Sequence, residues 1–291
     1  MSLDFNLDSW PWKFAVVFAL LGLRFLTPLL VQFFVSLFST KVTGDTTKWI
    51  KETIDSAAIA IGLVLLVIQP FILQAFYIPS SSMEDTLQIH DKLLVSKLIY
   101  RFKEPQFQDV VVFKAPPEAK FKSENPKEEV DFIKRCMGVA GDVVEVKDRK
   151  VFRNGQPIPE PYVKWSEAAQ TSEAAAPDAL GGEIRFSYDM KIYGGAVYSR
   201  EYIGPNEVGL WTKNDIVVPD ADQEAISAAA PGKVPAGKFL MLGDHRNRSN
   251  DGHVWGFVPR ANIVGKAICV FWPLRRLGLV DNMSVNQTPK E

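Results

Sequence analysis

The sequence predicts a mainly β protein in which two N-terminal transmembrane helices precede an external all-β domain that carries an inserted β subdomain. The helices are predicted by two long apolar runs, 14–38 and 57–78, in the first 80 of 291 residues. The β-domain is predicted by the part of the chain after residue 78, where short runs of β-favouring residues alternate with turn residues. No comparably long segment with helical periodicity appears after residue 78.

The second apolar run is the clearer membrane segment. Residues 57–78 carry no charged side chain, and a helix of this length, at about 1.5 Å per residue, crosses a bilayer. The first run contains Arg24 and Pro28, but an arginine near one end of a span can reach the lipid headgroups. We therefore expect a helix over about 14–38 and a cytoplasmic loop within residues 1–56, followed by a second helix over 57–78.

Charge around these runs predicts their orientation. Lys41, Lys48 and Lys51 lie between the two runs, whereas no Lys or Arg precedes Lys13. The positive-inside rule then puts the connecting loop in the cytoplasm and both termini outside. Everything after residue 78 is expected on the outer face of the membrane.

The external domain is predicted to comprise residues 79–158 and 236–280, followed by a polar tail, 281–291. Asn154-Gly155 predicts a hairpin turn. Between 159 and 235 the composition shifts to Ala, Pro and Gly, which predicts an inserted subdomain with loops at 166–182 and 226–237 and short strands at 184–188 and 209–211. The main domain contains six strand-like runs, at 93–100, 109–115, 130–140, 142–155, 238–244 and 263–272.

Composition excludes several classes of function. A net charge of −1 gives no reason to expect nucleic acid as a partner. Cys136 and Cys269 are the only cysteines, and neither lies in a CxxC motif or beside a histidine cluster. We expect two core cysteines and neither a metal nor a cofactor.

Three separated segments contain the polar residues of chemical interest. They are the serine run 80–82, Lys134 within VDFIKRCMG, and the loop GDHRNRSNDGHVWG at 243–256. Each alone has an ordinary explanation: a turn or cap, an exposed strand lysine, or a charged hairpin. Composition alone favours these ordinary explanations.

Strand alternation changes the interpretation of Lys134. Residues two apart share a face, so Phe132, Lys134 and Cys136 point one way, and Ile133 and Arg135 point the other. Apolar neighbours disfavour the ammonium and lower the lysine pKa, which would let a neutral amine act as general base for a serine nucleophile. The chain has only three histidines, so a Ser-His-Asp arrangement is possible, but a Ser-Lys dyad needs none.

The segments PSSSMEDTLQIHDKLLVSK, DFIKRCMGVAGD and GDHRNRSNDGHVWGFVP together resemble the sequence boxes of bacterial type I signal peptidases, the membrane-bound Ser-Lys proteases. The resemblance covers about residues 71–272 in the family's order and is weakest in the insertion. It implies a serine endopeptidase that cleaves N-terminal signal peptides from exported preproteins. Cleavage would follow a small residue, with small residues at −1 and −3, and would pass through an acyl-enzyme.

Residue roles follow from the same resemblance. Ser82 matches the nucleophile and Lys134 the general base, while Ser80 matches the hydroxyl that joins the Ser82 N–H in the oxyanion hole. Ser249 matches the serine that orients the lysine. The resemblance further implies supporting roles for Arg135, Asp244 and Asp251, and a substrate pocket walled by Phe76, Ile78, Met83, Leu87 and Ile133.

The sequence departs from the family pattern at a few positions. Asp85 stands where most members have proline, and Ser81 where many have glycine. His253 replaces an arginine that usually pairs with the loop aspartate, and Asn247-Arg248 replaces Asp-Asn. None of these changes removes a catalytic atom, but they leave the electrostatics of the loop open.

Two alternatives remain. One is another Ser-Lys membrane hydrolase on a related β-fold, such as a self-cleaving repressor-type protease, which the two predicted spans oppose. The other is a catalytically inactive, membrane-tethered domain that binds preproteins, which Ser82, Lys134 and Ser249 oppose. The favoured interpretation expects a multi-pass protein of the bacterial cytoplasmic membrane with its catalytic domain on the outer face. Its partners would be signal peptides and the lipid bilayer, and it would act as a monomer.

Overall fold

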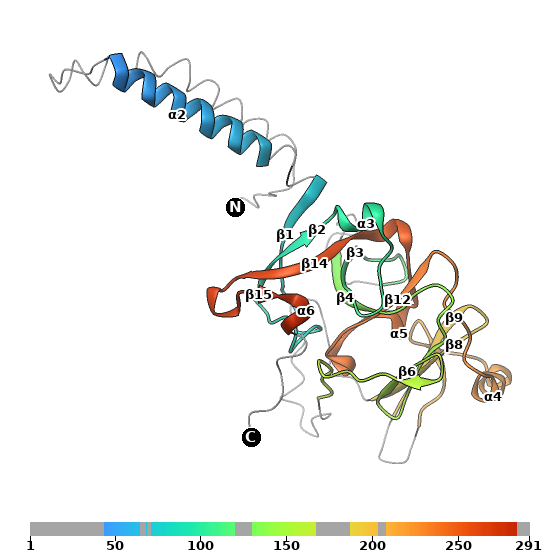
Figure 1. The fold of residues 1–291 in the computed structure, drawn as a ribbon. Helices are drawn as coiled ribbons and strands as arrows, with labels where there is room; N and C mark the ends of the chain where they lie inside the picture. The colour runs from blue at the N-terminus through green and yellow to red at the C-terminus, as the bar shows by residue number, and fades with distance from the viewer. Residues whose placement is uncertain are drawn as a thin grey trace, which may run out of the picture. The chain divides into compact units, whose positions relative to one another are not determined.

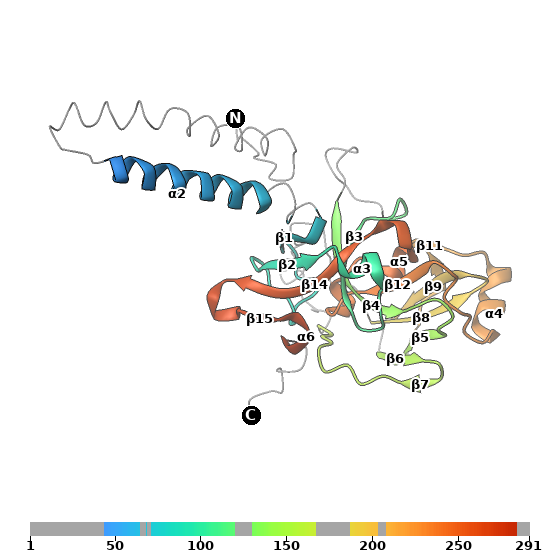
Figure 2. The same ribbon diagram turned by 45° about the horizontal axis from the view of Figure 1, so that its top comes forward.

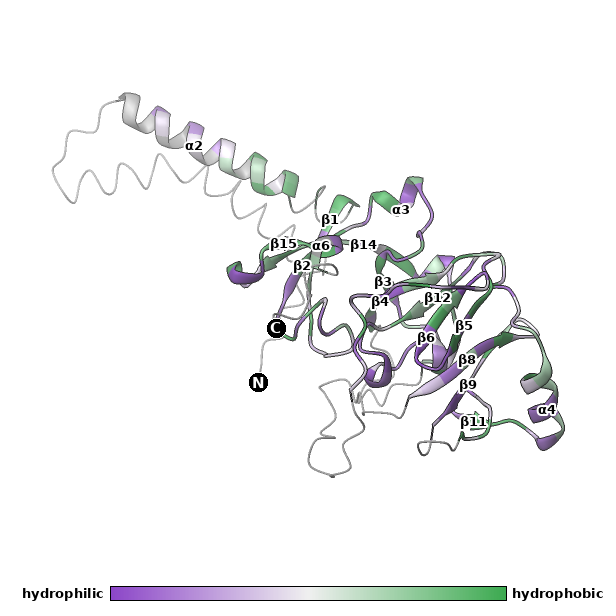
Figure 3. Ribbon diagram, turned by 60° about the horizontal axis from the view of Figure 1, so that its bottom comes forward, coloured by the Kyte–Doolittle hydropathy of each residue, from purple (hydrophilic) through white to green (hydrophobic). Residues whose placement is uncertain are grey.

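The computed structural model describes residues 44–64, 68, 71–119, 130–166, 187–202 and 208–283 (Figure 1). The chain divides into two compact units, residues 1–73 and 74–291. The first unit contains the helix α2, Gly44–Leu63, whose hydropathy rises toward Leu63 (Figure 3). Within the described ranges, no helix combines the length and the hydropathy needed to cross a membrane.

The structure bears on only one of the two predicted membrane helices. The helix over 14–38 lies outside the described residues. The boundaries predicted for the helix over 57–78 are wrong, because α2 begins at Gly44 and ends at Leu63, and the end of the apolar run forms strand β1, Leu73–Tyr77. An apolar run fits either a helix or a buried strand. Here, pairing with β2 at the edge of a sheet makes its end a strand.

The second unit is built on two antiparallel sheets. The first sheet has eight strands in the order β1-β2-β14-β3-β4-β12-β13, with β15 also paired to β14. The predicted strand at 263–272 is confirmed residue for residue as β14. The remaining strands are β2 (Lys92–Ser96), β3 (Val110–Lys114), β4 (Asp131–Gly138), β12 (Lys238–Leu242), β13 (Phe257–Pro259) and β15 (Gly278–Leu279).

Strand β14 pairs with two different strands along its length. The N-terminal part of this strand pairs with β3 and its C-terminal part with β2, with register shifts in both ladders. Gly265 lies at the register shift in the ladder with β3, and a Cβ at this position would come within 2.4 Å of the Ser96 carbonyl oxygen. The close approach of the β2 backbone therefore requires glycine at this position.

The second sheet joins strands of the predicted insertion to strands that precede it. Its seven strands run in the order β11-β10-β9-β8-β5-β6-β7, so the run 142–155 pairs with strands that lie after residue 159. The pairing of β5 with β8, through Glu145 with Lys191 and Val146 with Met190, makes this connection. The strands are β5 (Val144–Lys147), β6 (Lys150–Arg153), β7 (Gln156–Pro157), β8 (Tyr188–Tyr193), β9 (Ala196–Glu201), β10 (Thr212–Lys213) and β11 (Ile216–Val217).

Turn chemistry accounts for the β5-β6-β7 meander. Asn154 and Gly155 both have positive φ, 53° and 79°, so the predicted hairpin turn between β6 and β7 is confirmed. Asp148 and Arg149 also have positive φ and form a second tight turn, between β5 and β6. This second turn was not predicted because neither residue is glycine or asparagine.

Several short helices replace predicted strands or loops. The strand predicted over 93–100 ends at Ser96, and α3 follows at Ile99–Phe102. The strand predicted at 209–211 does not form, and the loop predicted from 226 is helical at its start, in α4. In two views, α4 lies beyond β8 and β9, away from β1 and β2 (Figures 1 and 2). The bounds are α4 Asp220–Ala228, α5 Gly252–Trp255 and α6 Val280–Met283, with single 3-10 turns at Arg246–Arg248, Arg260–Asn262 and Leu274–Arg276.

The two faces of β4 contact different parts of the core. Phe132 and Cys136 pack with Phe113, Met241 and Trp255 on one face. Ile133 packs on the other face, against a cluster that includes Ile78, Met83, Leu87, Leu93 and Val110. The chain that follows β1 folds back over this second cluster, which brings the serine run close to β4.

Candidate active site

The serine run lies in a loop of residues 79–91, here named the serine loop, that connects β1 to β2. Backbone hydrogen bonds close its base, from Ile78 N–H to the Asp91 carbonyl and from His90 N–H to the Ile78 carbonyl, both at 2.9 Å. The buried Asp91 carboxylate accepts from Arg276 Nε at 2.9 Å and from Gln88 N–H at 2.8 Å. The loop is therefore anchored at both ends, and its three serines are buried.

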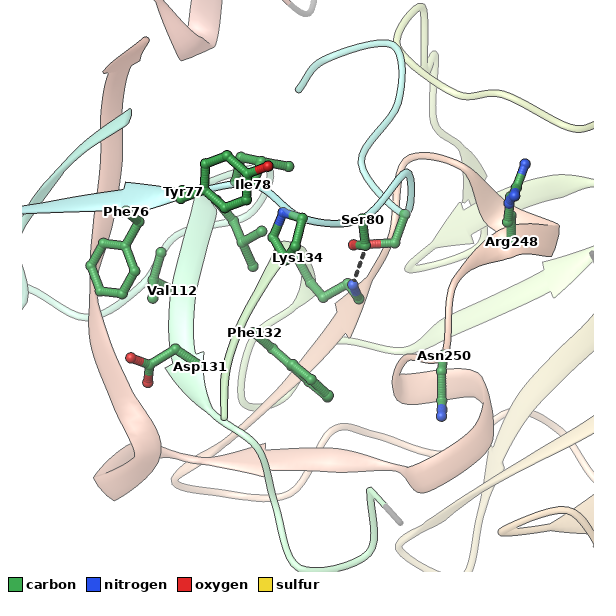
Figure 4. Close-up of a pocket in the computed structure, with 13 residues that line it drawn as sticks. Phe76, Tyr77, Ile78, Ser80, Val112, Asp131, Phe132, Lys134, Arg248 and Asn250 are labelled. Atoms are coloured by element: carbon green, nitrogen blue, oxygen red, sulfur yellow. Dashed lines mark hydrogen bonds between the residues drawn. The ribbon is translucent and has the colours of Figure 1, made fainter. Parts of the chain in front are cut away.

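Lys134 reaches this loop from the middle of β4. Its Nζ lies 2.6 Å from Ser82 Oγ, and the lysine and serine are only 5% and 6% exposed. The same Nζ also lies 5.6 Å from the centre of the Phe132 ring. Figure 4 shows the Lys134 side chain directed toward the serines. The structure therefore brings together the two residues that the sequence pattern paired.

Ser80 lies on the same side of the loop. Its Oγ is 3.2 Å from Ser82 Oγ, which places a second hydroxyl beside the first. The two serines and Lys134 line one pocket whose other walls are mostly apolar. In Figure 4, Phe76 and Val112 lie on one side of the Lys134 side chain, and Arg248 and Asn250 lie on the other. The full lining is Phe76, Tyr77, Ile78, Pro79, Ser80, Ser82, Val112, Asp131, Phe132, Ile133, Lys134, Arg248 and Asn250.

The predicted pocket walls are only partly correct. Phe76, Ile78 and Ile133 line the pocket. Met83 and Leu87 do not, because both are fully buried in the core beneath the serine loop. Their apolar character reflects packing of the loop on the sheet, and Val112 of β3 takes the wall position that the sequence did not indicate.

Arg135 and Asp244 form the predicted ion pair. Arg135 donates from Nε to Asp244 Oδ1 at 2.8 Å and from a terminal nitrogen to Oδ2 at 2.6 Å, and both side chains are buried. Burial alone would lower the pKa of Arg135, but the charge and hydrogen bonds of Asp244 raise it. Thr86 of the serine loop also donates to Asp244 at 2.6 Å, and the guanidinium lies 3.8 Å from the centre of the Tyr162 ring. The pair therefore links β4, the serine loop and residue 244.

Asp251 organises the loop that follows β12. Its carboxylate accepts from Gly243 N–H at 2.7 Å and lies 2.7 Å from His253 Nδ1. The His253 ring stacks on Tyr188, with 3.9 Å between the ring centres. Burial would raise the pKa of Asp251, but His253 and the hydrogen bonds lower it. His253 thus contacts the loop aspartate, which is the contact expected of an arginine at this position.

Ser249 lies close to the serine loop. It is 2% exposed, and a Cβ added at Gly243 would sit 2.2 Å from Ser249 Oγ and 2.6 Å from the Ser82 carbonyl oxygen. Gly243 is therefore the point at which the loop after β12, Ser249 and the Ser82 backbone meet. The orienting contact between Ser249 and Lys134 stays a prediction.

Asp85 and Ser81 are the two residues of the serine loop that depart from the family pattern. Asp85 Oδ1 lies 3.5 Å from Lys164 Nζ, and its side chain is 38% exposed. Asp85 does not line the pocket, and Ser81 is buried. The loop electrostatics that the sequence left open thus involve a lysine of the insertion. Lys164 was not predicted as part of the site because nothing near it in the chain indicates one.

No metal site is formed by the part of the chain that the structure describes, where no group of three or more His, Cys, Asp or Glu side chains is arranged to hold an ion. Cys136 is buried and Cys269 is partly buried, and both are free thiols.

Comparisons with known proteins show the family of this chain. The family model described as signal peptidase, peptidase S26, matches residues 48–272, a range that contains the serine loop, Lys134 and the loop 243–256. Signal peptidase I of Leptolyngbya laminosa is 36% identical over 221 residues, covering 76% of this chain and 79% of the relative. A probable signal peptidase I-2 of Synechocystis sp. is 34% identical over 230 residues, with 79% and 75% covered. Signal peptidase I of Aquifex aeolicus is 34% identical over 221 residues, with 72% and 80% covered. The chain therefore belongs to the signal peptidase family, peptidase S26.

Proposed function

We propose that this chain is a membrane-bound serine endopeptidase that cleaves N-terminal signal peptides from exported preproteins, with Ser82 as nucleophile and Lys134 as general base. The observation that carries the proposal is the 2.6 Å separation of Lys134 Nζ and Ser82 Oγ in buried surroundings. Burial disfavours the charged ammonium, and a neutral amine at this distance can accept the hydroxyl proton.

The first half of the reaction forms an acyl-enzyme. Ser82 Oγ attacks the scissile carbonyl carbon as its proton passes to Lys134 Nζ. The tetrahedral oxyanion accepts hydrogen bonds from the Ser82 N–H and the Ser80 hydroxyl, and one such donor typically contributes about 2.7–4 kcal/mol to transition-state stabilisation. As the intermediate collapses, the Lys134 ammonium returns the proton to the leaving amine. The mature protein departs with a free amino terminus, and the signal peptide remains as an ester on Ser82.

The second half repeats the proton transfers with water. Neutral Lys134 takes a proton from a water molecule as its oxygen attacks the ester carbonyl. Collapse of the second intermediate returns the proton from Lys134 to Ser82 Oγ, and the signal peptide leaves with a new carboxyl group, which loses its remaining proton to solvent. The oxyanion donors of the first step serve again, and no other group has to change its charge.

The pocket supports a preference for small apolar side chains next to the cleavage site. Its apolar walls include Phe76, Ile78, Val112 and Ile133. These four side chains are themselves packed in or against one core cluster, so a large substrate side chain would have to displace close-packed residues. We propose that small residues at −1 and −3 are selected on this surface.

The apolar run supports the membrane part of the proposal. The apolar run extends from the last turns of α2 into β1, and the serine loop with Ser82 follows β1 directly. Charge placement around the apolar runs supports a catalytic domain on the outer face of the bacterial cytoplasmic membrane. There, the cleavage site of a membrane-inserted signal peptide would emerge close to Ser82.

A preprotein assay in detergent tests the dyad. Ser82→Ala and Lys134→Ala should each lower kcat by about 10⁴-fold or more, as removal of a nucleophile or its base does in other serine proteases. Ser81→Ala is the matched control, because Ser81 lies in the same buried loop but takes no part in the proposed reaction. Its kcat should stay close to wild type. Full activity of either dyad variant would refute the assignment.

A further inference from the structure

His245 contacts the serine loop through its backbone and its ring. Its N–H donates to the Ser82 carbonyl at 3.1 Å. Its ring is almost fully buried, with Nδ1 3.3 Å from Glu84 Oε2 and Nε2 2.6 Å from Ser166 Oγ. His245 therefore contacts the proposed nucleophile Ser82, Glu84 of the serine loop, and Ser166 of the insertion.

The insertion side of this contact is a short segment, residues 160–166, here named the tether. Lys164 N–H donates to the Asp244 carbonyl, and Arg246 N–H donates to the Lys164 carbonyl, both at 2.9 Å, so Lys164 and His245 form a parallel bridge. Two positions beyond Lys164, Ser166 N–H donates to Asn247 Oδ1 at 3.0 Å, and Asn247 Nδ2 donates back to the Ser166 carbonyl at 2.7 Å. The tether therefore follows residues 244–247 like an added strand.

The start of the tether is held by a buried ion pair. Arg246 is fully buried and pairs with the Glu160 carboxylate, and its Nε donates to the Gly243 carbonyl at 3.0 Å. Near the other end, Lys164 Nζ lies 3.5 Å from the carboxylates of both Glu84 and Asp85. The tether thus contacts the serine loop as well as the loop after β12.

We propose that His245 is a positioning residue for the nucleophile and that the tether, through Ser166, holds it in place. The proposal rests on the proposed function of Ser82. The His245 N–H fixes the carbonyl end of Ser82, while Ser166 prevents the buried ring from turning. Oγ, Lys134 Nζ and the oxyanion donors must be aligned together, and a misplacement of 1 Å can cost about 10²-fold in rate.

The electrostatics around the ring suit a fixed, neutral imidazole. Burial lowers the pKa of His245; Glu84 opposes that shift, while Lys164 and Arg248 add to it. A neutral ring has one donor and one acceptor nitrogen, so it can share a hydrogen bond with the Ser166 hydroxyl while its other nitrogen faces Glu84. Asp85, where most family members have proline, adds a second carboxylate facing Lys164.

Ser166 variants test the proposal with the full chain in detergent and a preprotein that has alanine at −1 and −3. We expect Ser166→Ala to lower kcat by about tenfold per folded molecule while KM stays near its wild-type value. Ser166→Thr keeps the hydroxyl and should recover most of the rate. The folded fraction is taken from near-UV circular dichroism and gel filtration.

The possible results bear on the positioning role of His245 and on the proposed function as follows. A lower kcat in Ser166→Ala with recovery in Ser166→Thr supports positioning. A wild-type kcat per folded molecule in Ser166→Ala, even with fewer folded molecules, overturns it, because the tether would then serve stability alone. A rise in KM with unchanged kcat also overturns it. If the wild-type chain does not cleave, or if Ser82→Ala cleaves as well as wild type, the proposed function itself fails.

Discussion

The two faces of β4 carry adjacent basic residues in opposite situations. On one face, Lys134 meets the hydroxyl of Ser82 at 2.6 Å. On the other, Arg135 meets both carboxylate oxygens of Asp244. A bidentate carboxylate fixes the charge of a guanidinium that cannot be deprotonated in any case. An amine facing a hydroxyl can exchange its proton with that hydroxyl.

The difference shows how one strand separates chemistry from support. Alternation puts residues 134 and 135 on opposite faces, so the ion pair can bind the serine loop through Thr86 without adding a carboxylate next to Ser82 Oγ. A carboxylate beside Lys134 would favour its charged form. The fold therefore keeps a strong structural charge pair one residue away from Lys134, whose proposed role as a base requires the neutral form.

Exchange of the basic residue on the reactive face should have the largest effect. Lys134→Arg keeps a long, positively charged side chain but removes the neutral nitrogen that could accept a proton, because arginine stays protonated. We expect kcat for a preprotein to fall by about 10³-fold or more, because a general base typically contributes about 10²- to 10⁴-fold to the rate. Thermal stability should change little. A kcat close to wild type would mean that the amine does not act as the base and would remove the contrast between the two faces.

Loss of the carboxylate on the other face should act mainly on stability. Asp244→Asn leaves Arg135 buried without its counter-charge, and breaking a buried pair in this way costs about 3–5 kcal/mol. Urea unfolding of the variant measures the change. Arg135→Lys is the control, since it keeps the positive charge but loses the bidentate geometry, and it should lose less stability than Asp244→Asn. Equal stability of Asp244→Asn and wild type would contradict the supporting role of the pair.

Gly243, where the loop after β12 meets Ser249 and the Ser82 backbone, gives a third test. Gly243→Ala would place a Cβ 2.2 Å from Ser249 Oγ and 2.6 Å from the Ser82 carbonyl oxygen. The backbone would have to shift, which costs about 1–3 kcal/mol, and kcat should fall because Ser82 moves. Gly278→Ala is the matched control, as its Cβ would meet only a methionine methyl carbon at 3.4 Å. A neutral Gly243→Ala would show that the serine loop tolerates displacement at this point.

The features predictable from sequence were those set by local geometry. Alternation assigned Lys134 and Arg135 to opposite faces, Asn154-Gly155 signalled its turn, and β14 was predicted with both ends correct. In each case neighbouring residues carry the whole signal, as a period of two or as a pair of residues that tolerate positive φ.

The features that were missed depend on distant parts of the chain. Met83 and Leu87 were expected as pocket walls from the family resemblance, which matches positions in the sequence but does not show whether a side chain faces substrate or core. Their burial follows from the way the serine loop folds back on the sheet. The contact of Ser166 with His245 joins residues 79 positions apart, and no pattern in the sequence near either residue predicts it. The end of the apolar run became β1 for the same reason, since its pairing partner decides between helix and strand.

The smallest expected effect concerns pH and the His245 ring. Because the pKa of His245 is lowered in the folded state, chiefly by burial, the folded protein binds the proton less readily than the unfolded chain. Above the unfolded value of about 6.5 both states are neutral and the ring contributes nothing. As pH falls below that value the unfolded state gains the proton first, so stability is lost. His245→Asn cannot gain the proton and should lose less stability than wild type between about pH 6.5 and 5, as measured by urea unfolding across the range. An identical pH dependence in both proteins would show that the ring accepts its proton in the folded state, with Glu84 as the compensating charge.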